Sequence, residues 1–284
     1  MEASHQELPT NNAGQALSLV ELPRRITAYH KLQLKGLSTI YYCGESEHDR
    51  LYAVDIQHLA RGGKAPLGAR PGLFLHAGPS TDSPIVAAAG DEMLGPYQTY
   101  VRKGPNSDVI LVGSPKPELP DYGKNTMRAR TTDNGMVAFS FRVQEGSRPS
   151  EADEIFSWIQ VPEGSQPGFE YGGYKLVRHP HQKKPKLEPG MNLLCWMWWP
   201  TYNMSNEDEI IATLSYGKPR QLHSVVSLFT IELTSEDFAN NIGDAHARSI
   251  LATAARIFQM KATGRTSHSG LEKAERRRVR VACR

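Results

Sequence analysis

The chain has 284 residues, of which 39% are hydrophobic and 22% charged, and its formal net charge is +3. With a mean hydropathy of -0.47, this composition excludes a disordered chain, a collagen-like chain and a coiled coil. No apolar run approaches the roughly 18 residues that a membrane-spanning helix needs.

Residues 1–21 are polar without a sustained period, and we expect them to form a flexible leader. From residue 22 onward, short segments rich in β-branched and aromatic residues alternate with turns that contain Gly or Pro, a pattern typical of sandwiches and barrels. Fourteen segments have this character: 26–34, 38–43, 51–57, 72–77, 85–89, 97–103, 109–113, 126–131, 136–143, 154–161, 174–178, 192–199, 209–216 and 224–233. In 136–143, the apolar side chains alternate with Ser140 and Arg142, which predicts one inward and one outward face.

After residue 233 the pattern becomes helical. Thr234–Asp237 is a helix start signal, and Asp244 is expected to cap an Ala-rich run that Gly264 closes. This run is apolar on nearly every side, so the helix must be surrounded by other parts of the protein. The sequence therefore predicts a mostly β fold: a closed or nearly closed antiparallel barrel of about 12 strands, enclosing a C-terminal helix at about 244–263.

Residues 22–264 are expected to form one domain. Residues 265–284 hold seven of the 33 Lys and Arg residues and two of the 30 acids, so the rest of the chain has a net charge of -2. We expect this segment to be a disordered basic tail. It would be the candidate for contact with nucleic acid, and the sequence argues against that partner because the body shows no matching basic face.

A second basic segment, 174–186, contains five cations and no acid, a composition that favours phosphate binding. The candidate ligand-binding residues are Lys175, Arg178, Lys183, Lys184 and Lys186.

Several segments together resemble the tubby C-terminal-like superfamily of tubby proteins, phospholipid scramblases and LURP-one-related proteins, including its uncharacterised fungal members. They are LYAVDIQ, PGLFLHAGPSTDSPIVAAA, EIFSWIQ, GGYKLVRH, LLCWMWW, EIIATLSYG, SVVSLFTIEL and SILATAARIF, within 22–264. The resemblance implies a β-barrel around a central helix and a non-enzymatic binding or adaptor protein. By analogy with tubby proteins, Lys175, Arg178, Lys183 and Lys184 would contact anionic phospholipid headgroups. The cysteine cluster and acidic calcium segment of scramblases are missing, so lipid scrambling is not implied.

The sequence also supports an alternative, a barrel that binds a small molecule or serves as an accessory enzyme in a fungal biosynthetic pathway. Its candidate pocket residues are Trp196, Trp198 and Tyr202, although both faces of 192–199 are apolar, as in a core strand. His179 and His181 resemble the first half of a cupin metal motif. The acid that should follow comes too late, so neither a metal nor another cofactor is expected.

No catalytic motif is recognisable in the sequence, which argues against an enzyme. Ser80 has His76 and Asp82 nearby in sequence, but this spacing alone does not define a catalytic triad. The three cysteines form no CxxC pair, and the opening residues do not form a secretory leader. We therefore expect a cytoplasmic protein, with the peripheral membrane surface or the nucleus as further locations.

Overall fold

The computed structural model of the protein describes residues 22–31, 40–58, 64–94, 99–112, 124–143, 154–179, 209–218 and 225–282. The strands are β1 (Arg25–Lys31), β2 (Ile40–Gly44), β3 (Tyr52–Gln57), β4 (Gly72–His76), β5 (Ile85–Asp91), β6 (Met93–Leu94), β7 (Thr99–Tyr100), β8 (Ser107–Leu111), β9 (Lys124–Thr131), β10 (Val137–Val143), β11 (Glu154–Val161), β12 (Gly173–His179), β13 (Glu209–Tyr216) and β14 (Val225–Leu233). The helices are α1 (Glu236–Asn241), α2 (Asp244–Ala262) and α3 (His268–Ala282).

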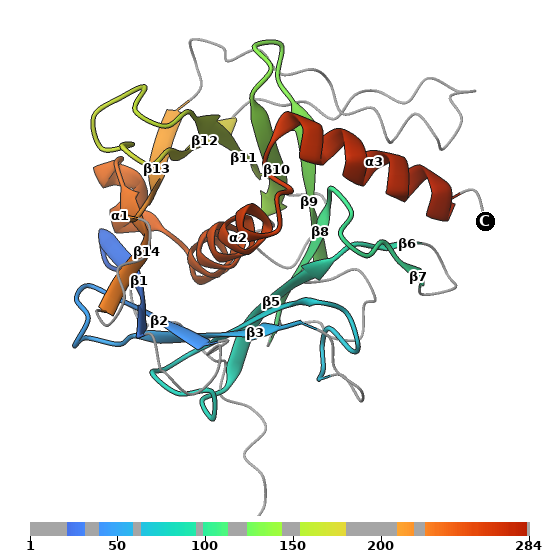
Figure 1. Ribbon diagram of the computed structural model, residues 1–284. Helices are drawn as coiled ribbons and strands as arrows, with labels where there is room; N and C mark the ends of the chain where they lie inside the picture. Colours follow the sequence, from blue (N-terminus) through green and yellow to red (C-terminus); the bar gives the residue numbers. More distant parts are fainter. Residues whose placement is uncertain are drawn as a thin grey trace, which may run out of the picture.

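Twelve of these strands form a closed antiparallel barrel in the order β1-β14-β13-β12-β11-β10-β9-β8-β5-β4-β3-β2. The ring closes because β1 pairs with both β14 and β2. Strands β6 and β7 form a separate two-stranded sheet beside the barrel (Figure 1). Closure removes the unpaired strand edges that an open sheet would expose, and it confirms the fold class predicted from the sequence.

Helix α2 lies along the centre of the ring of strands (Figure 1). Its 19 residues span about 28 Å, and the side chains from His246 to Ile257 are all buried. The Trp158 indole of β11 donates a hydrogen bond of 2.9 Å to the Thr253 hydroxyl of α2. The helix begins at Asp244 as predicted, but Gly243 is its N-cap and makes no side-chain capping bond. The prediction of Asp244 as the cap is therefore wrong by one residue.

The predicted strand segments agree closely with the observed strands wherever the structure describes them. Alternation in β10 is confirmed, because its apolar residues Val137, Phe139, Phe141 and Val143 all belong to the core around α2. Segment 97–103 shortens to the two residues of β7. Segments 1–21 and 192–199 lie outside the described residues.

The prediction of a disordered tail after residue 264 is wrong, because His268–Ala282 form helix α3. Leu271 and Ala274 are three residues apart on one side of the helix, and both are buried. Arg278 extends that side and donates to the carboxylate of Glu92 at 2.9 Å. The basic composition concealed this buried stripe. None of the described helices is both long enough and apolar enough to cross a membrane.

Candidate anion-binding face

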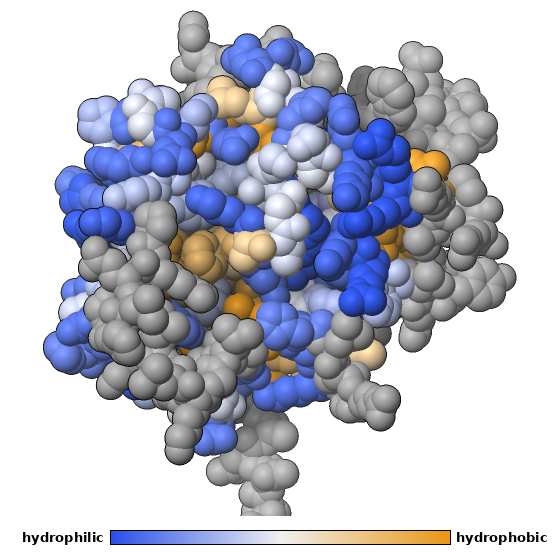
Figure 2. Space-filling view, in the orientation of Figure 1, coloured by the Kyte–Doolittle hydropathy of each residue, from blue (hydrophilic) through white to orange (hydrophobic). Residues whose placement is uncertain are grey.

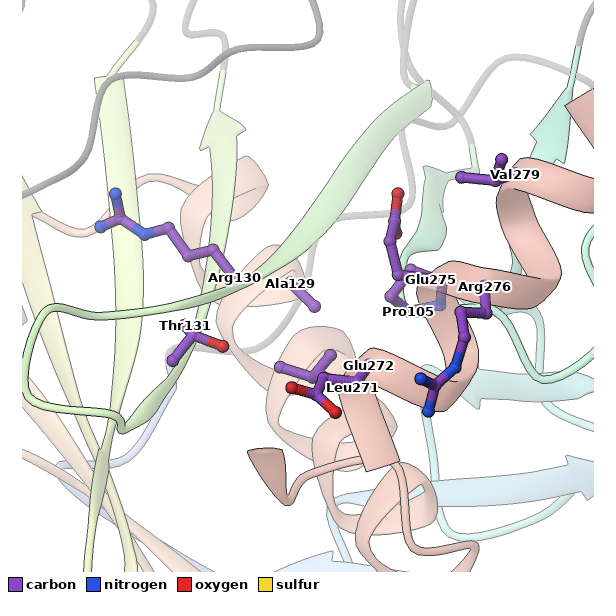
Figure 3. A pocket seen from close by; sticks show the side chains of 9 residues that line it. All are labelled: Pro105, Ala129, Arg130, Thr131, Leu271, Glu272, Glu275, Arg276 and Val279. Carbon is purple, nitrogen blue, oxygen red and sulfur yellow. The ribbon is translucent and has the colours of Figure 1, made fainter. Parts of the chain in front are cut away.

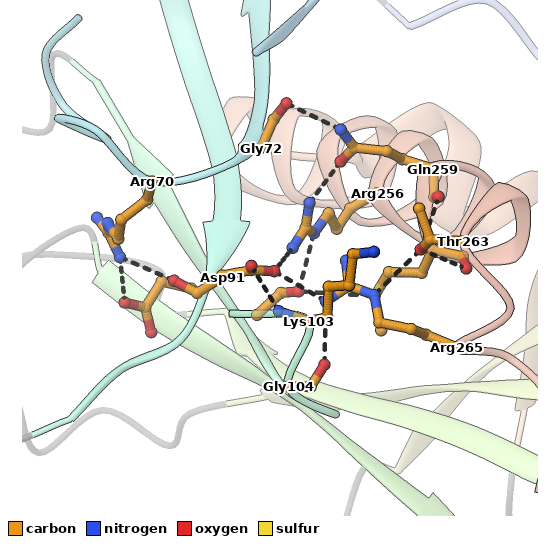
Figure 4. A network of polar contacts seen from close by, with 12 residues as sticks. Arg70, Gly72, Asp91, Lys103, Gly104, Arg256, Gln259, Thr263 and Arg265 are labelled. Carbon is orange, nitrogen blue, oxygen red and sulfur yellow. Dashed lines mark hydrogen bonds and ion pairs between the residues drawn. The ribbon is translucent and has the colours of Figure 1, made fainter. Parts of the chain in front are cut away.

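The buried polar contacts beside α2 centre on Asp91, at the end of β5 (Figure 4). One carboxylate oxygen of Asp91 accepts from Arg256 of α2 at 2.6 Å and from Arg265 at 2.8 Å. The other accepts from the backbone amide of Lys103 at 2.9 Å. Burial alone would raise the pKa of Asp91, but the two guanidinium groups outweigh it and lower that pKa. Because both oxygens already accept hydrogen bonds, we interpret this group as one that fixes α2 in the barrel.

Two further buried acids extend this network. The carboxylate of Asp108 in β8 accepts from Arg70 at 2.7 Å. The Glu92 carboxylate accepts from Asn106 at 3.0 Å and from Arg278 of α3 at 2.9 Å. Two arginines of the segment that was expected to be a free tail, Arg265 and Arg278, therefore neutralise acids of the barrel.

The two described members of the predicted basic segment, Lys175 and Arg178, project from opposite faces of β12. Arg178 is paired in register with Phe156, which belongs to the core, so its side chain is on the inner face. Lys175 is paired with Ile159 on the outer face. The structure therefore does not bring these two cations into one patch. Lys183, Lys184 and Lys186 lie outside the described residues.

Arg178 is already neutralised at the end of the barrel near α1. It forms an ion pair with Glu154 of β11 and a longer one, 3.8 Å, with Glu209 of β13. The second oxygen of Glu154 is 3.0 Å from the His246 ring of α2. The hydrogen bond with His246 lowers the pKa of Glu154 to about 2; burial opposes this shift and Arg178 adds to it. We interpret this cluster as a structural junction between strands and α2.

The other residues singled out in the sequence give no second site. His179 is buried on β12, and within the described ranges no three potential metal ligands lie together. His181, Trp196, Trp198 and Tyr202 lie outside those ranges.

The Ser80 segment is not arranged as a catalytic triad. The Ser80 hydroxyl donates to Asp82 at 3.1 Å, whereas the His76 ring bonds to the backbone oxygen of Ser83 at 2.7 Å. The histidine that a triad would need as its base is therefore directed to another group.

Cations gather instead on the outer side of β9 to β12, where several of the residues between them are buried. Met127 and Ala129 of β9 pack into the core, so the alternate residues of that strand project outward. The registers of β9 to β12 extend this face across four strands. Its side chains are Lys124, Thr126, Arg128, Arg130, Ala138, Ser140, Arg142, Ile155, Ser157, Ile159, Val161, Lys175, Val177 and His179. Five are cations and none is a carboxylate, but Lys124 is paired at 3.3 Å with Asp108 of the neighbouring strand β8. We call Lys124, Arg128, Arg130, Arg142 and Lys175 the basic face.

Arg128 and Lys175 are the two members of the basic face for which the described residues provide no ion pair. The side chain of Arg128 is half-buried. Burial lowers the pKa of Arg128; the charge of Glu92 opposes this shift, and Arg278 and Arg142 add to it. Glu92, the acid whose charge acts on Arg128, already accepts from Arg278 and Asn106. A half-buried cation among other cations is the electrostatic environment that attracts an anion.

Helix α3 adds the partly or fully exposed cations Lys273, Arg276 and Arg277, and the exposed acids Glu272 and Glu275 lie among them. Figure 2 shows strongly hydrophilic residues gathered on the side of the molecule where α3 lies. Between α3 and the end of β9 is an open groove of about 720 Å³. In Figure 3, Ala129 faces α3 across this groove while Arg130 extends from the opposite side of the strand. The groove and the basic face therefore lie on opposite sides of β9, with Arg130 at the edge of the groove.

Sequence reasoning missed this surface because its cations are spread over four strands and one helix. The signal that could have found it is the alternation Arg128-x-Arg130, which places both side chains on one face of a strand. No family model, curated protein or solved structure matches this chain. The functional interpretation therefore depends on the chemistry of this surface.

Proposed function

We propose that the protein is a non-enzymatic binding or adaptor protein that associates with anionic phospholipid headgroups at a membrane surface. The observation that carries this proposal is the basic face, where five cations project from β9 to β12 without a carboxylate among the outward side chains. Lys and Arg residues near an anionic membrane each contribute about 1 kcal/mol. Lys124 is already paired with Asp108, so this contribution comes from the other members of the basic face.

Helix α3 supports the same function. Its exposed Arg276 and half-buried Arg277 lie near Val279, which is 52% exposed. A helix that presents cations beside an apolar side chain is typical of segments that lie on a membrane surface. The interior of the barrel supports a surface function as well, because the side chains of α2 are buried along most of its length.

The proposal includes membership of the tubby C-terminal-like superfamily. A closed barrel of 12 antiparallel strands around α2 is the architecture that the resemblance in the sequence implies. The site differs from the basic segment expected by analogy with tubby proteins, because its cations lie on β9, β10 and α3, with Lys175 on β12.

The test is flotation with vesicles of phosphatidylcholine, compared with vesicles in which part of that lipid is replaced by phosphatidylserine. The wild-type chain should float only with the anionic vesicles, and less at high salt. The variant R276Q/R277Q removes two cations and should weaken partitioning by about 30-fold, from about 1 kcal/mol per cation. The matched control, R25Q/K218Q, removes two cations at exposed positions of β1 and the end of β13, and should float like the wild type.

A third variant, K183Q/K184Q, separates this surface from the segment predicted by the sequence. If it abolishes flotation while R276Q/R277Q does not, the lipid contacts lie on that segment and the site argued here is wrong. Equal recovery of the wild type with neutral and anionic vesicles would remove the membrane function altogether.

A further inference from the structure

A pair of buried hydroxyl groups lies beside Arg128 on the basic face. Ser140 of β10 is opposite Arg128 in one register and opposite Ser157 of β11 in the next. The two serine hydroxyl oxygens are 2.7 Å apart, and the residues are only 4% and 1% exposed. Directly opposed residues have Cβ atoms about 5 Å apart, so the three side chains form a continuous row across three strands.

The hydrogen-bonding capacity of this row is not exhausted. Two hydroxyl groups have two protons to donate, and the bond between them uses one. Within the part of the chain that the structure describes, neither hydroxyl has a further acceptor. A buried donor without an acceptor is costly, so the row is suited to a ligand that brings acceptor oxygens.

The charges around Arg128, Ser140 and Ser157 indicate which class of ligand would bind there. Arg142 lies two residues beyond Ser140 on the same face, diagonal to Arg128 and within reach of its long side chain. Arg278 approaches from α3, where its Nε donates to Glu92. An arginine fork next to a hydroxyl donor and a second arginine matches an oxyanion with several acceptor oxygens and more than one negative charge.

We propose that Arg128, Ser140 and Ser157, with Arg142 beside them, form a specific site for a phosphate monoester on the outer face of β9 to β11. The ligand chemistry is a terminal phosphate group, carried either by a lipid headgroup or by a soluble phosphate. This inference deepens the proposed function and rests on it for the lipid source, whereas the binding of soluble phosphate can be tested without a membrane.

The first experiment titrates the full chain with inorganic phosphate at constant ionic strength and follows the midpoint of thermal unfolding, with chloride as the reference salt. The wild type should show a saturable rise in the midpoint with phosphate. Arg128→Gln should abolish the rise, and Arg128→Lys should weaken binding by roughly tenfold because lysine lacks the planar fork. Arg25→Gln removes an exposed cation of β1, which lies outside the basic face, and should leave the rise unchanged.

Ser140→Ala provides a second readout in case Arg128→Gln does not fold. It removes one hydroxyl and keeps every charge, so a weaker phosphate response in this variant identifies hydrogen bonding at the row. The absence of a saturable response in the wild type, or an unchanged response in both Arg128→Gln and Ser140→Ala, would overturn the inference.

The second experiment distinguishes the two sources. Flotation compares vesicles that contain phosphatidic acid, a phosphate monoester, with vesicles of phosphatidylglycerol, a diester, adjusted to equal surface charge. A preference for phosphatidic acid that Arg128→Gln removes identifies a lipid headgroup as the ligand. Saturable phosphate binding without that preference identifies a soluble phosphate. If the protein floats equally with both lipids and does not bind phosphate, the phosphate site is refuted and the membrane function stands. If it binds phosphate but floats with neither lipid, the phosphate site stands and the membrane function is refuted.

Discussion

Replacing Asp91 by asparagine should be among the most destabilising single changes in this protein. The substitution conserves shape but removes the charge that faces Arg256 and Arg265, both at most 5% exposed. These two guanidinium groups would then stay buried without their carboxylate. Removing one partner of a buried ion pair costs about 3–5 kcal/mol, because the remaining charge cannot regain its hydration. Domains are commonly stable by only about 5–15 kcal/mol, so the loss is a large fraction of the total.

The assay is urea unfolding followed by tryptophan fluorescence, in which the buried Trp158 reports on the barrel interior. The unfolding midpoint should fall with little change in slope, and the thermal midpoint should fall by about 6–20 °C. Asp133→Asn makes the same chemical change at an exposed turn and should alter stability by less than about 0.5 kcal/mol.

Coupling within the network gives a sharper test. Adding Arg256→Met to Asp91→Asn removes one of the two stranded charges, so the double variant should lose less stability than the sum of the single losses. A loss below about 1 kcal/mol for Asp91→Asn, or strictly additive losses in the double variant, would refute the view that this network holds α2 in the barrel.

Three further predictions concern groups inside the barrel. The folded-state pKa of Glu154 is about 2, below its ordinary value of 4.5, mainly because of the hydrogen bond with His246. The contribution of Glu154 to stability is therefore complete above about pH 4.5 and is lost as the pH falls toward 2. In Glu154→Gln, the urea midpoint should change less with pH over that range. Burial raises the pKa of the Cys43 thiol to about 12, so alkylation at pH 8, mapped by mass spectrometry, should modify Cys43 only after unfolding. Thr253→Val removes the acceptor of the Trp158 indole and should cost about 1–3 kcal/mol in urea unfolding; a smaller loss would mean that another acceptor replaces it.

The strands of this protein were predictable because their signals are local. Alternation in 137–143 depends only on the two-residue period of a strand, and Gly and Pro mark the turns on either side. Helix α2 was predictable for a related reason: a helix that is apolar on every side must be surrounded, and the only structure available to surround it was the set of preceding strands.

The sequence predicted the chemistry of the candidate site but not its location. The sequence favoured phosphate binding through Lys175 and Arg178, but the strand places these residues on opposite faces, and Glu154 and Glu209 neutralise the arginine. Apart from the pair Arg128 and Arg130, the cations of the basic face are far apart in the sequence and become neighbours only through strand pairing.

What the sequence by itself determined is therefore the class of the fold: short alternating strands and a buried helix, both of which follow from patterns a few residues long. Tertiary structure alone decided which charges meet. Asp91 and Arg265 are 174 residues apart in the chain. Their 2.8 Å contact places an arginine of the apparent basic tail in a buried ion pair with the barrel. The physical reason is that the energy of a charge depends on its burial and on its nearest opposite charge, and both are set by contacts between distant segments of the chain.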